Sequence, residues 1–473
     1  MVVPHALVVP YPAQGHVDPL MELSHRLAKL GILVTFVHTE FSHAHVMAAL
    51  PENCFGEYNG GIRLVTIPDG AANDEERRDR SRFFVVIKRS MPSFLEELIV
   101  KINEREENKI TYVIVDGFIG FLLNVAEKLK IPRAAFFPAS TWQLAILLNI
   151  GKLLDSGFIN HNGSVQNYDK AADILEDVHP IRPKHPCWVN YKDVKWQVIC
   201  FKYLCNNFEA VKHVDHILCN SFSELELPVF RHLNGAVPIG PLLSANRSTL
   251  PQPSSFWAED LSCIDWLDQQ PNCSVIYVSF GSMTVLRQQQ ISELALGLEL
   301  TGRPFLWVCR PDLMEFSPAI YPDGFLDRVS KQGRVVNWTP QKEVLSHPSV
   351  ACFLTHCGWN SALEGLSNGV PMLCWPYFFD QFQNQTYIVE LWKVGLALAE
   401  DSLGIVRKEE IKEKIEDLIK NDGIRKRVTE LKDKVRKAVM DGSGVSTRNL
   451  ECFASTMKGA KARFTTNNTE KLQ

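Results

Sequence analysis

The first forty residues show a buried-strand pattern followed by a helical pattern. His5–Pro10 is a short apolar run, which is typical of a strand inside a parallel sheet. The leucines that follow recur with helical spacing, at Leu20, Leu23, Leu27 and Leu30. Gly31 can take the left-handed conformation that ends a helix, and a second apolar run covers residues 32–38. The pattern predicts a strand–helix–strand unit.

The expected N-cap of this first helix is Asp18, with Pro19 at the first helical position. The same pattern recurs later in the chain. A β-branched strand over Thr111–Val115 stops at Asp116, a helical stretch follows, and another apolar strand covers Arg133–Phe137. The N-terminal half is therefore predicted to be α/β.

A polar, proline-rich stretch without periodicity separates the two halves of the chain, between about Gly240 and Asp260. Strands are expected again after it, over Ser274–Phe280, Pro304–Cys309, Arg334–Trp338, Val350–His356 and Pro371–Trp375. The charged stretch 407–440 predicts helices with a solvated face. The fold class is thus α/β, with two doubly wound domains. Their predicted bounds are 1–245 and 257–450, with a linker over 246–256 and a C-terminal helix and tail over 451–473 that packs back toward the first domain.

Composition narrows the class of protein. Of 473 residues, 45% are hydrophobic and 22% are charged, which is typical of a folded globular protein. The net charge is −4 and no basic block stands out, so nucleic-acid binding is not expected. The twelve cysteines lack paired C-x-x-C spacing, so reduced thiols without a metal are expected. No signal segment is visible and the most apolar later window, 134–150, is interrupted by polar residues, which predicts a cytoplasmic protein without a membrane anchor. A monomer is expected.

Two titratable residues of the first half follow predicted strands directly. His16 lies in the loop after the first strand, and Asp116 ends a later strand. Ligands of open parallel sheets collect at the carboxyl ends of strands, and a histidine oriented by a carboxylate is a general base near neutral pH. The alternative is that His16 packs at a helix start and Asp116 caps the next helix. Position alone leaves both interpretations open.

The second half offers two candidate phosphate-binding turns. Phe280–Ser282 follows a strand, and Thr355–Ser361 joins a strand to a helix, which brings backbone N–H groups and a helix N-terminus together. The dinucleotide signature G-x-G-x-x-G is absent after the first strand of the chain. Ser361 and Glu364 have the S-x-x-E spacing of a capping box, and spacing alone favours that structural role for Glu364.

Residues Trp338 to Gln381 resemble the 44-residue signature box of plant UDP-sugar-dependent glycosyltransferases of small molecules. The matching segments are Trp338–Gln341, His356–Ser361, Glu364–Gly365, Pro371, Trp375–Pro376 and Asp380–Gln381. Pro10–His16 is similar to the family's catalytic loop, and Phe280–Ser282 to its second phosphate loop. The resemblance covers nearly the whole chain. It implies the family's GT-B fold, in which two Rossmann-like doubly wound domains face a cleft.

The resemblance also implies roles for individual residues. Trp338 would stack on uracil, Gln341 would lie by the ribose, and Glu364 would accept hydrogen bonds from the ribose hydroxyls, which replaces the capping interpretation. The diphosphate would be held by Ser282, His356, Gly358, Asn360 and Ser361. The sugar hydroxyls would be bound by Trp359, Asp380 and Gln381. His16 would be the base, oriented by Asp116.

The implied reaction is transfer of glucose from UDP-glucose to an acceptor hydroxyl. One base and no second carboxylate nucleophile imply a single displacement, so an α-linked donor gives a β-glucoside. No Asp-x-Asp triplet occurs, so a metal-independent mechanism without a bound cofactor is expected, with His356, loop N–H groups and a helix dipole in place of a cation. Glutamine at position 381 is typical of glucose users and histidine of galactose users. Trp359 stands where glucuronate users tend to carry arginine.

The acceptor site is the least determined part. Candidate lining residues are Phe118, Phe121, Thr141, Trp142, Trp188 and Phe379. A pocket lined by these residues would suit a flat apolar acceptor of the flavonoid, phenolic, monolignol or terpenoid class. The alternative for each aromatic residue is that it belongs to the hydrophobic core. Two other functions stay open. A sugar-nucleotide epimerase or hydrolase would need no acceptor, and a catalytically inactive binding protein would not need His16 and Asp116.

Overall fold

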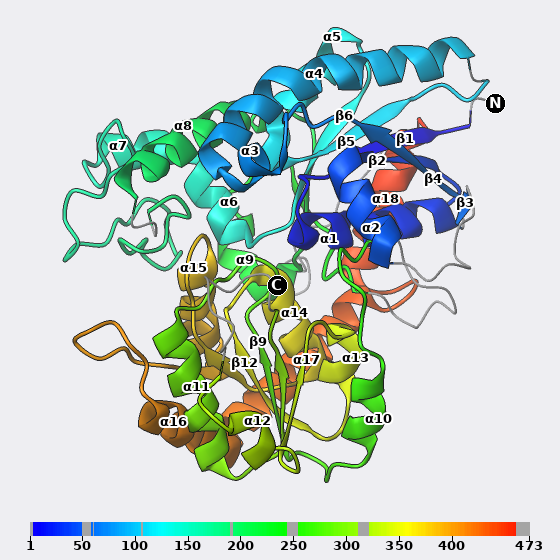
Figure 1. The fold of residues 1–473 in the computed structure, drawn as a ribbon. Coiled ribbons are helices and arrows are strands. Elements are labelled where there is room, and N and C mark those ends of the chain that lie inside the picture. The colour runs from blue at the N-terminus through cyan, green and yellow to red at the C-terminus, as the bar shows by residue number, and fades with distance from the viewer. Residues whose placement is uncertain are drawn as a thin grey trace, which may run out of the picture. The chain divides into compact units, whose positions relative to one another are not determined.

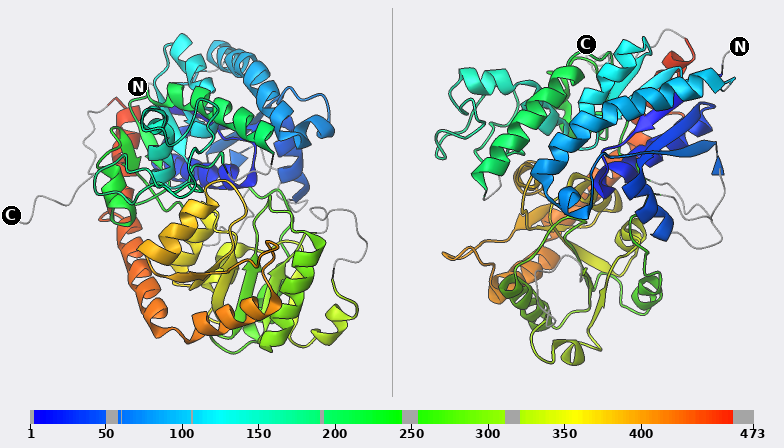
Figure 2. Two further views of the ribbon diagram at one scale, coloured as in Figure 1. Left: turned by 90° about the vertical axis from the view of Figure 1, so that its left-hand side faces the viewer. Right: turned by 45° about the horizontal axis from the view of Figure 1, so that its top comes forward.

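The computed structural model describes residues 3–49, 58–59, 61–105, 107–189, 193–243, 254–310 and 321–459. The chain divides into two units, drawn in Figures 1 and 2. The first comprises Met1–Trp257 together with Lys437–Gln473, and the second comprises Ala258–Arg436. Residues 246–253 of the predicted linker lie outside the described residues, as does the tail from residue 460 onward.

The first unit is built on a mostly parallel sheet. Its strands in the described ranges are β1 (His5–Val9), β2 (Leu33–Thr39), β3 (Tyr58–Asn59), β4 (Ile62–Ile67), β5 (Tyr112–Asp116), β6 (Arg133–Phe137), β7 (Ile217–Cys219) and β8 (Ala236–Pro238). They lie in the order β3-β4-β2-β1-β5-β6-β7-β8, and only the β3–β4 pair is antiparallel. Every residue of β1 and β5 is buried, as expected of strands in the middle of such a sheet.

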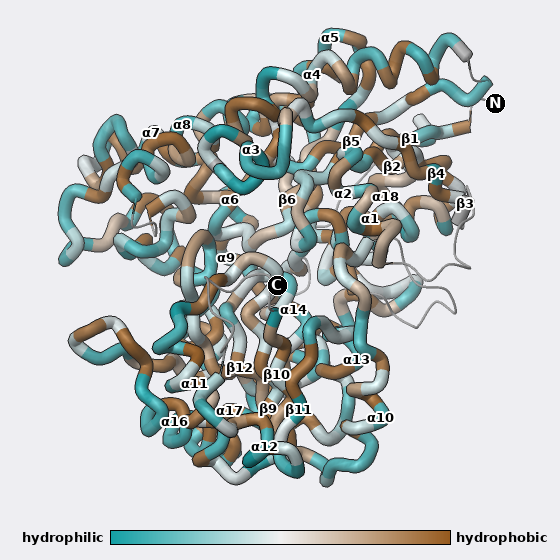
Figure 3. Tube along the Cα trace, in the orientation of Figure 1, coloured by the Kyte–Doolittle hydropathy of each residue, from teal (hydrophilic) through white to brown (hydrophobic). Residues whose placement is uncertain are grey.

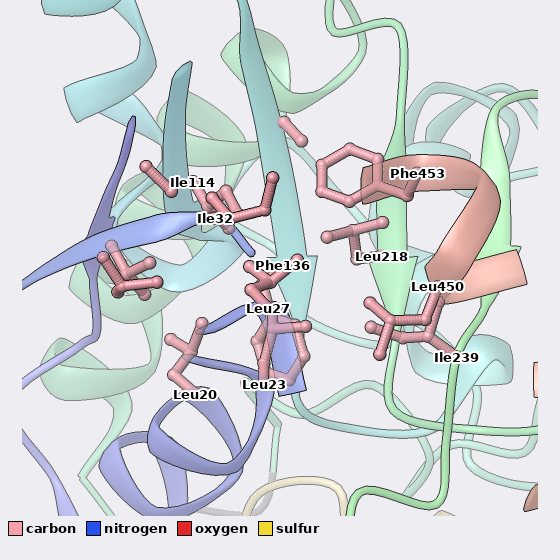
Figure 4. Packing of buried hydrophobic residues seen from close by; sticks show 14 of the residues in the cluster. Leu20, Leu23, Leu27, Ile32, Ile114, Phe136, Leu218, Ile239, Leu450 and Phe453 are labelled. Carbon is pink, nitrogen blue, oxygen red and sulfur yellow. The ribbon is translucent and has the colours of Figure 1, made fainter. Parts of the chain in front are cut away.

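The helices of the first unit come from both ends of the chain. They are α1 (Gln14–Lys29), α2 (Glu40–Ala49), α3 (Asp74–Arg78), α4 (Arg80–Arg105), the 3₁₀ helix η2 (Gly117–Leu122), α5 (Leu123–Lys128), α6 (Thr141–Leu148), α7 (Ile150–Asp155), α8 (Val194–Val211), α9 (Ser223–Phe230) and α18 (Val445–Met457). α4 alternates hydrophobic and hydrophilic residues along its length (Figure 3), as a helix with one apolar face does. Figure 4 shows leucines of α1 and Leu450 and Phe453 of α18 packed with strand residues in one core.

The second unit contains a sheet that is parallel throughout its described strands. These are β9 (Val275–Ser279), β10 (Phe305–Val308), β11 (Gly333–Val336), β12 (Val350–Thr355), β13 (Met372–Cys374) and β14 (Gly395–Ala397), in the order β11-β10-β9-β12-β13-β14. The helices are α10 (Ser262–Asp268), α11 (Gln288–Thr301), α12 (Phe325–Arg328), α13 (Gln341–Ser346), α14 (Trp359–Asn368), α15 (Gln381–Thr386), the π-helix η4 (Tyr387–Leu391), α16 (Lys408–Lys420) and α17 (Asp422–Val439), which crosses the unit boundary. Apolar side chains of α11 and α16 pack with the central strands.

Both units are therefore parallel α/β structures, and the predicted fold class is confirmed. The predicted strand over Arg133–Phe137 has the observed bounds of β6, and the other predicted strands differ from the observed ones by one or two residues at one or both ends. Gly31 has a φ of +78° and follows Leu30, the C-cap of α1, as a left-handed helix terminus requires.

The predicted start of the first helix is wrong. α1 begins at Gln14, and Pro19 lies inside it rather than at its first position. The N-cap is Ala13, which has extended backbone geometry and no side-chain capping bond, so the sequence carries no signal at this position. The Asp18 carboxylate accepts a hydrogen bond from the Ser254 hydroxyl at 3.1 Å instead of capping the helix. The earlier start places His16 in the first turn of α1.

Candidate active site

The topology of the first sheet brings His16 and Asp116 together. β1 and β5 are parallel neighbours, with Val9 opposite Val115, so the residues that follow these strands share one edge of the sheet. Asp116 is the last residue of β5, and His16 is in the helix turn after β1. The imidazole Nδ1 lies 2.7 Å from a carboxylate oxygen of Asp116. The Asp116 side chain is fully buried, whereas the His16 side chain is 20% exposed.

Asp116 has two structural roles at once. One carboxylate oxygen bonds to His16, and the other accepts the backbone N–H of Phe118 at 2.9 Å, which caps η2. The helix-capping interpretation from the sequence therefore describes one oxygen and the orienting interpretation describes the other. Because the Nδ1–H of the ring is directed to the carboxylate, Nε2 is the nitrogen left to accept a proton from a substrate.

The candidate acceptor residues of the first unit differ in their surroundings. Phe118 lies edge-on to the His16 ring, with ring centroids 5.2 Å apart, and stacks on Phe137. Phe121 is buried near Tyr203. Thr141 begins α6 and has a fully buried hydroxyl without a hydrogen-bond partner in the structure.

The two candidate tryptophans of this unit are both buried. Trp142 is 1% exposed and packs edge-on to His179 and His185. Trp188 is fully buried, its ring is tilted by 52° to that of Phe201, and its indole N–H donates to the Gly163 carbonyl at 2.8 Å. The core alternative therefore describes Trp188, because its polar group is satisfied inside the protein.

In the second unit, His356 is enclosed by two glycines at the carboxyl ends of β9 and β12. A Cβ atom on Gly281, where φ is +69°, would lie 2.6 Å from the imidazole Nε2, and one on Gly358 would lie 2.5 Å from it. Only glycine allows this approach. Nδ1 is buried without a hydrogen-bond partner in the structure. Burial lowers the pKa of His356 to about 4, and a backbone hydrogen bond with Ser279 opposes this shift only in part.

The pKa of His356 changes one expectation from the sequence. The imidazole is neutral at pH 7, so it can offer a hydrogen bond to a phosphate but brings no positive charge of its own. The backbone N–H groups at the start of α14, whose N-cap is Gly358, are electropositive groups next to this imidazole in the chain. Asn360 and Ser361 lie in the first turn of that helix, and Ser282 lies in the turn after β9.

Gln341 and Glu364 form one hydrogen-bonded network. The Gln341 amide donates to a Glu364 carboxylate oxygen at 2.6 Å and to the Ser361 hydroxyl at 3.0 Å, and its oxygen accepts from the Tyr277 hydroxyl at 3.0 Å. Glu364 is 5% exposed. The capping-box interpretation of Ser361 and Glu364 is wrong, because α14 already begins at Trp359 and both residues lie inside it.

The residues expected to bind the sugar are mostly buried. Asp380 accepts a hydrogen bond from the Asn384 amide at 2.9 Å. The Gln381 side-chain oxygen accepts the backbone N–H groups of Tyr377 and Phe378, so its amide nitrogen is the end left to donate. Trp359 is 4% exposed, and its indole lies 6.2 Å from the Tyr387 ring and 6.1 Å from that of Trp392. Phe379, which precedes Asp380 in the chain, is half-buried and has a φ of +59°.

Two residues of this region were missed by the sequence reasoning. The Arg310 guanidinium, at the carboxyl end of β10, lies over the Trp338 ring at 5.9 Å from its centroid. Trp338 is half-buried, and the hydroxyl of Tyr277 in β9 donates to the side-chain oxygen of Gln341. Neither position belongs to a matched motif segment, and their roles depend on contacts between strands that are distant in sequence.

No group of three or more His, Cys, Asp or Glu side chains in the described ranges is arranged to hold a metal ion. No helix in these ranges combines the length and the apolar character needed to cross a lipid bilayer.

Known proteins match this chain along nearly its whole length. The family model for UDP-glucoronosyl and UDP-glucosyl transferase matches residues 188–437. UDP-glycosyltransferase 83A1 of Arabidopsis thaliana is 40% identical over 465 residues, which is 96% of this chain and 97% of the relative.

Solved structures agree with that match. A UDP-glucosyltransferase from Polygonum tinctorium, capable of glucosylating indoxyl, has a TM-score of 0.80 at 28% identity, with 97% of this chain and 99% of that chain covered. Os79 from O. sativa in complex with UDP has a TM-score of 0.79 at 26% identity, with 96% and 100% covered. This chain therefore belongs to the plant family of UDP-glycosyltransferases, enzymes that transfer a sugar from a UDP-sugar to small-molecule acceptors.

Proposed function

We propose that this enzyme transfers glucose from UDP-glucose to a hydroxyl group of a small apolar acceptor, with inversion at the anomeric carbon and with His16 as the base. The observation that supports the proposal most directly is the 2.7 Å contact between His16 Nδ1 and the buried Asp116 carboxylate. A partly exposed imidazole held by a buried carboxylate has the arrangement of a general base.

The proposed step is a single displacement. The acceptor oxygen forms a bond to the anomeric carbon while the bond from that carbon to the UDP oxygen breaks and its electron pair leaves with UDP. The acceptor proton passes to Nε2 of His16, and the Asp116 carboxylate stabilises the imidazolium that results. Because attack and departure occur on opposite faces, an α-linked donor gives a β-glucoside.

The donor would be bound by residues of the second unit. Trp338 would stack on uracil, and Gln341 and Glu364 would meet the ribose hydroxyls through the network in which they already take part. Backbone N–H groups at the N-terminus of α14 would stabilise the negative charge that develops on the diphosphate, with His356 as a neutral hydrogen-bond donor. This arrangement supports a mechanism without a metal ion.

The preference for glucose is proposed from Asp380 and Gln381 together. The Gln381 amide nitrogen can donate to a sugar hydroxyl, because its oxygen is already occupied by Tyr377 and Phe378. Asp380 next to it can accept from a hydroxyl. Inverting one sugar centre would leave a buried partner unpaired at a cost of about 1–3 kcal/mol, or roughly ten- to a hundredfold in preference.

The role of His16 is tested with the variant His16→Ala. Transfer to a weakly acidic aliphatic alcohol should fall by about a hundredfold or more while UDP binding is retained, because a general base contributes about 10²–10⁴ in rate. His45→Ala is a matched control, since His45 is a half-buried histidine of the same unit that bonds to the Phe41 carbonyl. Near wild-type turnover of the His16→Ala variant would remove His16 from the mechanism. Asp116→Asn should lower turnover less than His16→Ala, with the fold checked by circular dichroism.

Donor choice and metal independence need separate assays. UDP-glucose should exceed UDP-galactose in kcat/KM by at least about tenfold and UDP-glucuronate by more, because Trp359, which carries no charge, would face the carboxylate of the sugar in the proposed site. Gln381→His should narrow the difference in kcat/KM between UDP-glucose and UDP-galactose.

Transfer activity should persist in EDTA. A complete loss of activity that Mg²⁺ or Mn²⁺ restores would contradict the metal-independent step. A panel of flavonoids, phenolic acids, monolignols and terpenols would identify the acceptor.

A further inference from the structure

A row of aromatic side chains extends from His16 in the first unit. The Tyr11 ring centroid lies 5.0 Å from that of His16, and the Phe84 ring lies 6.5 Å further, edge-on to Tyr11. Trp196 continues the row at 5.0 Å from Phe84. The three aromatic residues come from the loop after β1, from α4 and from α8, and α4 and α8 run side by side (Figures 1 and 2).

The middle of this aromatic row is buried, and its two ends are partly exposed. Phe84 is 8% exposed and stacks face to face on Tyr203, with ring centroids 4.0 Å apart and planes at 8°. Tyr11 and Trp196 are half-buried. A buried aromatic pair is thus flanked by two rings that still offer surface to a ligand.

The row is also tied to the catalytic pair. The Tyr203 hydroxyl donates to the Phe118 carbonyl at 2.8 Å, and Phe118 follows Asp116 by two residues in η2. Phe118 in turn lies edge-on to His16. The position of the row relative to His16 is therefore fixed by packing and hydrogen bonds within one unit.

We infer that Tyr11 and Trp196 are acceptor-specificity residues, which select acceptors with planar aromatic rings over saturated rings of the same size. The inference rests on the proposed role of His16 as the base, because that role puts the acceptor hydroxyl next to Tyr11. Aromatic rings gain about two- to tenfold in binding from each ring contact beyond their buried area, and saturated rings do not have this gain. Tyr11 meets the ring nearest to the hydroxyl, and Trp196 meets the distal part of a longer acceptor.

Two pairs of alcohols test the inference without changing the acidity of the hydroxyl. The short pair is 2-phenylethanol and 2-cyclohexylethanol, and the long pair is 2-naphthylethanol and its decalin counterpart. Dissociation constants are measured by calorimetry on the full chain saturated with UDP. The wild type should bind each aromatic alcohol at least about threefold more tightly than its saturated partner, with the larger ratio for the long pair.

The variants separate the two ends of the row. Tyr11→Leu should lower the aromatic preference for both pairs, whereas Trp196→Leu should lower it for the long pair alone. Tyr11→Phe and Trp196→Phe keep a ring and should keep the preference. Tyr168→Leu is the matched control, because Tyr168 is a 64% exposed aromatic residue of the same unit. Thermal unfolding of each variant checks that the fold is intact.

The outcomes distinguish this inference from the proposed base. Equal binding of aromatic and saturated alcohols, or no measurable binding of 2-naphthylethanol, would overturn the inference even if His16→Ala abolishes turnover. A preference that survives in both leucine variants would overturn it as well. The opposite outcome is also distinguishable. If His16→Ala turns over at the wild-type rate and Tyr11→Leu still removes the aromatic preference, then the role of His16 as the base is wrong and the role of Tyr11 in acceptor selection stands.

Discussion

His38 gives the sharpest prediction about stability in this protein. It lies in β2, is 1% exposed, and neither ring nitrogen has a hydrogen-bond partner in the structure. Burial, with a smaller contribution from the nearby His43, lowers the pKa of His38 to about 3. The folded protein therefore holds a neutral imidazole that the unfolded chain would protonate below about pH 6.5.

The sign and size of the effect follow from these two pKa values. The unfolded state binds more protons than the folded state between pH 6.5 and pH 3, so the free energy of unfolding falls as the pH is lowered through that range. At pH 5 this single residue costs about 2 kcal/mol relative to pH 7, because one pKa unit corresponds to about 1.4 kcal/mol and about 1.5 units separate pH 5 from the unfolded pKa. His38→Phe removes the titration.

The assay compares how much the opening free energy changes with pH in the wild type and in the variant. The opening free energy of β1 and β2 is measured by amide hydrogen exchange at pH 7 and pH 5, for the wild type and for His38→Phe, after correction for intrinsic exchange rates. Any change in packing caused by the substitution affects the opening free energy equally at both pH values, so it cancels. Between pH 7 and pH 5 the opening free energy of the wild type should therefore fall by about 2 kcal/mol more than that of the variant. Phe36→Leu, a neighbouring change in the same strand without a titratable group, should give no such difference from the wild type. A difference near zero for His38→Phe would refute the buried neutral state of His38.

Three further predictions concern residues whose contacts are defined in the structure. Gln341→Leu removes the bonds to Glu364, Ser361 and Tyr277 and should raise the KM for UDP-glucose by about tenfold or more with a smaller change in kcat, which initial rates would measure. Gly281→Ala should weaken UDP binding in calorimetry because its Cβ would displace His356, whereas Gly302→Ala, which has a similar positive φ and open space around it, should not. Glu226→Ala should lower the free energy of unfolding by at least about 2 kcal/mol, because its buried carboxylate accepts from the backbone N–H groups of Thr141 and Trp142 and from the Ser221 hydroxyl, and Glu226→Gln should cost less.

The strands could be predicted from the sequence because their signal is local. A run such as Arg133–Phe137 is short, mostly apolar and bounded by Pro132 and Pro138, and it has the bounds of β6. The start of α1 could not be predicted in the same way. Its N-cap, Ala13, makes no side-chain capping bond. Asp18 and Pro19 are residue types that commonly begin a helix, but here they lie inside it.

The candidate site depends on the order of strands, which the sequence does not encode locally. His16 and Asp116 are one hundred residues apart, and they meet because β1 and β5 are neighbours in the sheet. Their residue types and their places after strands could be predicted, but the contact itself required the topology. Tyr11, Phe84 and Trp196 form a row for the same reason, since three elements distant in sequence bring them together.

Residue type also says less about a binding site than the hydrogen bonds that a side chain already makes. Read from the sequence, Gln381 can both donate to and accept from a sugar hydroxyl. In the structure its oxygen is occupied by the backbone N–H groups of Tyr377 and Phe378, so the side chain is reduced to a donor. Discrimination between sugars that differ at one hydroxyl needs both a donor and an acceptor at fixed positions. Under the proposed glucose preference, the hydrogen-bond acceptor would then come from a neighbour, and the carboxylate of the adjacent Asp380 has the chemistry to provide it. The proposed donor choice would therefore depend on the Asp380–Gln381 pair rather than on the glutamine alone.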